Sequence, residues 1–166
     1  MKKLGAVMVL VAFASLSSAA PADVDLHDYW DQRCSYCHGH SSDFARRFLR
    51  IEQGRLRGVH RHDDLDGFLR NHYLTEQLVE PVRAMLMAQL TTKPLFGQKC
   101  GACHGTAAAF ARQSLRIVNG DLLGTKSGIK VVDYLAGHGR LELHDVPIMA
   151  ETLRRVRHEV SSPVNP

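Results

Sequence analysis

Two short motifs hold the residues of this chain whose types and spacing are best suited to chemistry. Residues 34–38 read Cys-Ser-Tyr-Cys-His and residues 100–104 read Cys-Gly-Ala-Cys-His, and together they contain all four cysteines of the chain. Two cysteines on one helical turn can each form a thioether with a vinyl group of a haem, and the histidine that follows can bind the iron. The spacing therefore predicts covalent attachment of two haems. The cysteines expected to form the thioethers are Cys34, Cys37, Cys100 and Cys103, and the expected first axial ligands are His38 and His104.

Three other uses of paired cysteines compete with this interpretation. A thioredoxin-like redox pair lies in a βαβ context, which the chain does not show. A structural zinc site usually has its two cysteine pairs about 12 to 20 residues apart, whereas 62 residues separate Cys37 from Cys100. Two plain disulfides are conceivable in an exported protein. None of these explains why a histidine follows each pair, or why the flanking sequence repeats with the pairs.

The two motifs belong to an internal repeat. Sliding the chain by 66 residues superposes it on itself without a gap, and 19 of the 62 pairs between residues 29–90 and 95–156 are identical. The copies join near residues 91–94. The predicted division is a signal peptide over 1–22, a first haem domain over 23–92, a second over 93–160 and a flexible tail over 161–166.

The second axial position of each iron also needs a ligand. Among the histidines and methionines that follow the motifs, only His72 and His138 fall on each other in the repeat. Apolar residues precede each of them by seven, four and three positions, so that the imidazole shares the apolar helix face that would cover a haem. We therefore predict bis-histidine ligation by His72 and His138, with Met149, in a Pro-x-Met segment, as the rival to His138. The histidines without a repeated partner are expected to be solvated: His27, His40, His60, His62, His144 and His158.

The elements that position these residues are expected to be helices. The expected helices are 23–33, 42–50, 62–72 and 75–90 in the first copy, and 107–116, 128–138 and 142–160 in the second. Tight turns around a buried leucine are expected at 54–58 and 120–124. A domain of 66 residues is close to the lower limit for a self-sufficient core, so a haem would be a structural part of each copy.

At these residues the chain resembles the c-type cytochromes. Residues 95–105, Leu-Phe-Gly-Gln-Lys-Cys-Gly-Ala-Cys-His-Gly, are similar to the opening of a small class I domain. The resemblance implies an all-α fold of two tandem helical domains, each wrapped around one covalent haem, and electron transfer to other redox proteins. The chain departs from class I domains in one respect, because neither copy has a methionine ligand in a loop before its last helix.

The first 22 residues predict export. Lys2 and Lys3 precede an apolar stretch over residues 4–16 and a run of small residues, which is typical of a signal peptide. The mature chain is expected to begin at Asp23. The alternative is an uncleaved anchor, although the apolar stretch is shorter than the roughly 20 residues that span a bilayer. Removal of Lys2 and Lys3 from the 21 basic residues leaves 19 against 17 acidic ones, which argues against a nucleic-acid partner.

The expected function is that of a periplasmic dihaem electron carrier that is not an enzyme. Iron with two histidine ligands has no open position for a substrate, and histidine in place of methionine lowers the reduction potential. One alternative is the cytochrome subunit of a periplasmic dehydrogenase or reductase. The other is a haem enzyme or gas sensor in which one iron keeps an open position.

Overall fold

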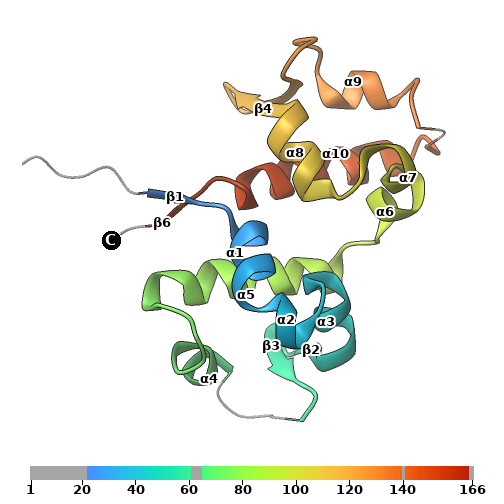
Figure 1. Ribbon diagram of the computed structural model, residues 1–166. Coiled ribbons are helices and arrows are strands. Elements are labelled where there is room, and N and C mark those ends of the chain that lie inside the picture. The colour runs from blue at the N-terminus through green and yellow to red at the C-terminus, as the bar shows by residue number, and fades with distance from the viewer. Residues whose placement is uncertain (1–21, 61–64, 140, 165–166) are drawn as a thin grey trace, which may run out of the picture.

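The computed structural model describes residues 22–60, 65–139 and 141–164. The predicted signal peptide therefore lies almost wholly outside the described residues, as does His62. The first copy, coloured blue to green in Figure 1, lies below the second, coloured yellow to red. Within the described residues, no helix combines the length and apolar character that a membrane crossing requires.

The two copies have the same order of elements. The first contains α1 (Leu26–Arg33), α2 (Ser35–His38), α3 (Ser41–Phe48), β2 (Leu49–Glu52), β3 (Arg55–Gly58), α4 (Leu65–Arg70) and α5 (Glu76–Thr91). The second contains α6 (Leu95–Lys99), α7 (Gly101–His104), α8 (Ala107–Ser114), β4 (Leu115–Val118), β5 (Asp121–Gly124), α9 (Val131–Leu135) and α10 (Asp145–Glu159). Two further strands, β1 (Ala22–Val24) and β6 (Ser162–Val164), lie at the ends of the described chain.

Each copy has its own apolar core around its long last helix. In the first copy Val82, Met85 and Leu86 of α5 are buried against α1 and α3. In the second copy Met149 and Leu153 of α10 are buried against α8 and α9. The long helix thereby supports the elements on which the cysteine motifs and the candidate ligands lie.

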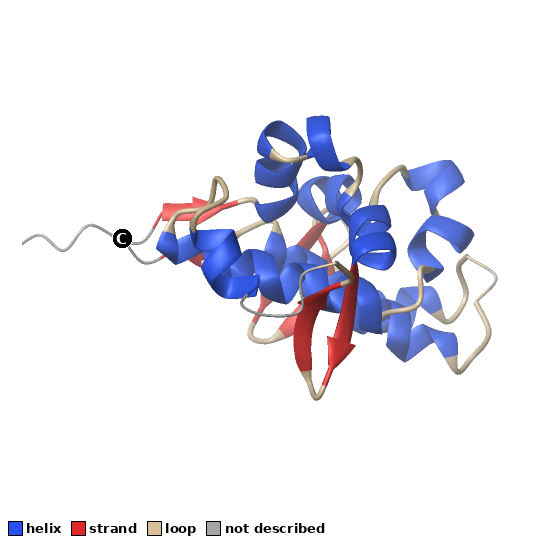
Figure 2. Cartoon of the chain, turned by 90° about the horizontal axis from the view of Figure 1, so that it is seen from below, coloured by secondary structure: helices blue, strands red, loops and turns tan. Residues whose placement is uncertain are grey.

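The prediction of an all-α fold is wrong, because each copy contains a β-hairpin. Strand β2 pairs antiparallel with β3, and β4 pairs in the same register with β5; Figure 2 shows the strands in red among the helices. The turn residues Gln53 and Gly54 have φ of 50° and 74°, and Asn119 and Gly120 have φ of 50° and 82°. Two consecutive residues with positive φ form the tight turn whose twist matches paired strands. The helices over 42–50 and 107–116 accordingly end earlier than predicted, at Phe48 and Ser114.

The buried leucine of each turn segment was predicted correctly. Leu56 and Leu122, on β3 and β5, are each 4% exposed and belong to the cores of their copies. The hairpins thus close one side of each core.

The two ends of the described chain lie side by side. Strand β1 pairs antiparallel with β6, from Ala22 opposite Val164 to Val24 opposite Ser162, as Figure 1 shows. Part of the segment over 161–166, expected as a flexible tail, is therefore a paired strand. The first residues of the expected helix over 23–33 form a strand as well, so that helix α1 begins at Leu26.

Candidate functional site

Each cysteine motif forms one short helical turn. The amide of His38 donates to the carbonyl oxygen of Cys34 at 3.0 Å, and the amide of His104 donates to that of Cys100 at the same distance. The glycine that follows each motif ends the turn with a positive φ, 69° at Gly39 and 70° at Gly105. The local backbone therefore presents two cysteines and a histidine together in both copies.

The structure brings the predicted ligands together in pairs. The ring centroids of His38 and His72 lie 5.8 Å apart with an angle of 64° between the ring planes, and those of His104 and His138 lie 6.1 Å apart at 62°. Two imidazoles on opposite sides of one metal ion, with bonds of about 2 Å, have centroids about 6 Å apart. The spacing in both copies fits a shared iron.

Aromatic rings surround both histidine pairs in the same arrangement. Phe44 lies edge-on to His38 at 4.7 Å, and its repeat counterpart Phe110 lies edge-on to His104 at 4.8 Å. On the opposite side, Phe68 and Tyr134 each lie 4.7 Å from the histidine four residues later. Each pair thus has aromatic rings on both sides, against which a porphyrin could pack. The helices expected over 62–72 and 128–138 end earlier, at Arg70 and Leu135. Both histidines therefore lie in the turn that follows the helix and not on the helix itself.

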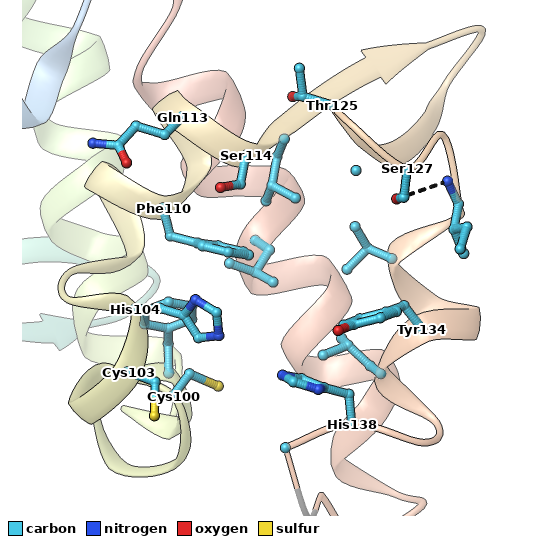
Figure 3. A pocket seen from close by; sticks show the side chains of 18 of the residues that line it. Cys100, Cys103, His104, Phe110, Gln113, Ser114, Thr125, Ser127, Tyr134 and His138 are labelled. Carbon is cyan, nitrogen blue, oxygen red and sulfur yellow. Dashed lines mark hydrogen bonds between the residues drawn. The ribbon is translucent and has the colours of Figure 1, made fainter.

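A cavity of about 710 Å³ separates the two histidines of the second copy. Cys100, Cys103 and His104 lie on one side of it and Tyr134 and His138 on the other (Figure 3). The remaining lining is largely apolar and includes Leu115, Val131, Leu135 and Leu153. Pockets for cofactor-sized ligands usually have volumes of about 300 to 1,000 Å³. The cavity and its donor groups fit a haem, with thiols for its vinyl groups and imidazoles for its iron.

The state of the thiols is unlike that of a thiol–disulfide redox pair. All four cysteines are free. Burial raises the pKa of the Cys34 thiol, and burial together with the neighbouring Cys103 raises the pKa of Cys100. Reactive redox cysteines have a lowered pKa instead.

Among the residues that the structure describes, no three His, Cys, Asp or Glu side chains form a metal-binding group.

The protonation state of His38 suits a metal ligand. Burial, and then the neighbouring His72, lower its pKa from the ordinary value of 6.5. The imidazole is therefore neutral at neutral pH, and the neutral ring is the form that binds a metal ion.

The other candidate ligands lie elsewhere. Met149 is fully buried in the core of the second copy and is not among the residues that line its cavity. His144 is exposed beside Asp145. His27, expected to be solvated, is only 11% exposed in its side chain and pairs with Glu159 at 2.8 Å. That expectation was wrong because a buried carboxylate of the other copy covers the ring.

Sequence reasoning missed one residue close to a site. The hydroxyl of Tyr29 donates a hydrogen bond of 2.8 Å to the carbonyl oxygen of Tyr73, the residue after His72. These two residues lie 44 positions apart, and no local pattern connects them.

Comparisons with protein-family models, with curated proteins and with solved structures found no match. Function is therefore argued from the two sites themselves.

Proposed function

We propose that this chain carries two covalent haems and transfers single electrons between redox proteins. The first haem would be held by thioethers to Cys34 and Cys37 and by His38 and His72. The second would be held by Cys100, Cys103, His104 and His138. The signal peptide predicted over residues 1–22 supports export to the periplasm, which is where the resemblance to c-type cytochromes implies that haem is attached.

One observation carries the proposal: the same pair of facing imidazoles occurs twice. The two centroid separations, 5.8 and 6.1 Å, differ by 0.3 Å, although only 19 of 62 aligned positions are identical. Two copies that differ at most positions have thus kept one arrangement, and its spacing is the one that two ligands of a single metal ion require.

The chain's own residues suit electron transfer better than catalysis. A haem iron supplies a one-electron change between the ferric and ferrous states. Bound to the iron, His72 and His138 would leave no open position at which a substrate could bind. These facing histidines favour a carrier over a haem enzyme or gas sensor.

The two candidate sites lie in separate parts of the molecule. Helices α4 and α9, which precede His72 and His138, lie at opposite ends of the view in Figure 1. Each site therefore has its own part of the surface, so that a donor and an acceptor can bind at the same time. Both partners are proposed to be redox proteins, and a catalytic subunit of a dehydrogenase or reductase is one such partner.

Mass spectrometry of the exported protein tests the proposal. We expect a chain that begins at Asp23 and carries two haem masses, both retained after acid-acetone extraction because thioethers survive where coordination bonds do not. The double variant Cys34→Ala/Cys37→Ala should carry one haem, and the matched variant Cys100→Ala/Cys103→Ala should carry the other. A wild-type chain without added mass would refute the proposal.

A further inference from the structure

The residue after each candidate distal ligand has a left-handed backbone. Tyr73 follows His72 with φ of 62°, and Gly139 follows His138 with φ of 80°. Glycine adopts this conformation readily, whereas a tyrosine has a side chain that opposes it. The two copies therefore make the same turn, but the turn of the first copy is strained.

The first copy has a hydrogen bond at this turn that its counterpart cannot form. Tyr29 of α1 donates its hydroxyl to the carbonyl oxygen of Tyr73 at 2.8 Å. The position that aligns with Tyr29 in the second copy is Leu95, which has no hydroxyl. This hydrogen bond, called the tether below, thus lies at the strained turn of the first copy. The glycine turn of the second copy has no equivalent bond from the aligned position.

The tether acts at the carbonyl group of the residue that directly follows the ligand. The amide of His72 donates to the carbonyl oxygen of Leu69 at 3.1 Å, which closes the preceding turn. The imidazole packs on Phe68 at 4.7 Å and against the ring of Tyr73 at 5.2 Å. Holding the Tyr73 carbonyl therefore holds the backbone on one side of the ligand, while the helical turn holds the other.

Tyr29 remains a hydrogen-bond donor at neutral pH. Burial raises the pKa of its hydroxyl above the ordinary value of 10.0. The tether therefore persists throughout the range in which the protein would work.

We propose that Tyr29 is a positioning residue that keeps His72 directed at the first haem, and that Gly139 removes the need for such a residue at the second. This inference rests on the proposed function. It makes the two haems unequal. Binding of His72 to the first iron depends on a hydrogen bond from a distant residue, whereas binding of His138 to the second iron does not.

The test compares carbon monoxide binding by the ferrous wild-type holoprotein and by Tyr29→Phe, which loses only the hydroxyl. One neutral hydrogen bond is worth about 1 kcal/mol, so that the equilibrium constant for His72 binding should fall about fivefold. Carbon monoxide affinity should rise by the same factor at one haem per chain and stay unchanged at the other. Asp28→Asn is the matched control, because Asp28 precedes Tyr29 on α1 and its exposed side chain accepts a hydrogen bond from Gln32, and it should behave as the wild type.

A second variant separates positioning from general loosening of the fold. Tyr29→Phe/Tyr73→Gly gives the first copy the unstrained turn of the second, and we expect carbon monoxide affinity within about twofold of the wild type. An unchanged Tyr29→Phe protein, or a double variant without recovery, would overturn the inference. Neither result bears on haem attachment, which is refuted if the wild-type chain carries no added mass.

Discussion

Glu159 joins the two copies through a buried hydrogen bond with His27, and its removal should weaken the whole molecule. The carboxylate lies near the end of α10 in the second copy and is 2.8 Å from the Nε2 atom of His27 on α1 of the first copy. It also accepts a hydrogen bond from Arg155 one turn earlier on α10. The side chains of Glu159, His27 and Arg155 are 9%, 11% and 24% exposed. The carboxylate is therefore the shared partner of two poorly solvated donors.

The cost of Glu159→Ala follows from these exposures. Glu159→Ala leaves His27 and Arg155 without this acceptor, and each buried donor left without a partner costs about 1–3 kcal/mol. Arg155 can reach water, which reduces the penalty, so we expect the free energy of unfolding to fall by about 2–4 kcal/mol. For a chain of this size that corresponds to a Tm lower by roughly 6–12 °C.

Thermal denaturation of the holoprotein, followed by far-UV circular dichroism, measures this effect. Glu151→Ala is the matched control, because Glu151 lies on the same helix and pairs with Arg154 but is 74% exposed. An exposed pair contributes less than about 1 kcal/mol, so this control should melt close to the wild type. Equal melting temperatures for the two variants would refute the idea that the buried pair holds the copies together.

Two further predictions concern the ligands and the response to acid. His72→Ala should turn only the first haem high-spin in the ferric absorption spectrum and His138→Ala only the second, whereas two low-spin haems in the double variant would exclude the ligand assignment. Burial opposes ionisation of Asp25, but the hydrogen bonds from Arg112 and from the amide of Asp28, together with the positive charge of Arg112, outweigh burial and lower the pKa of Asp25 below 3.8. A carboxyl group whose pKa is lowered on folding stabilises the fold when the pH is above its pKa in the unfolded chain. The stability difference between wild type and Asp25→Asn should therefore be complete above about pH 4. It should disappear as the pH falls through the pKa of Asp25 in the folded protein. Denaturant titrations at neutral and acidic pH measure that difference, and a value independent of pH would contradict the interpretation.

The candidate sites could be anticipated from local sequence. The cysteine motifs need only one helical turn to act together, and the repeat singled out His72 and His138 from the other histidines. Helix periodicity predicted that both share an apolar helix face, whereas the structure places them in the turns after α4 and α9. They nevertheless lie opposite His38 and His104. The ligand set itself stays a prediction until haem is measured.

The sequence by itself determined the features that depend on neighbours along the chain: the repeat, the motif turns, most of the helices and the buried leucines Leu56 and Leu122. The hairpins also had a local signal, since Asn119-Gly120 is typical of a two-residue turn, but the helical pattern around it led to an all-α prediction.

Only the tertiary structure decided the contacts between distant residues. The pairing of β1 with β6, the burial of His27 by Glu159 and the bond from Tyr29 to Tyr73 join residues between 44 and 142 positions apart. No period or spacing predicts such contacts, because they depend on which surfaces meet when the two cores pack. The reason is physical: turns and helix faces follow from the preferences of neighbouring residues, whereas a long-range bond forms only where the whole fold brings donor and acceptor together.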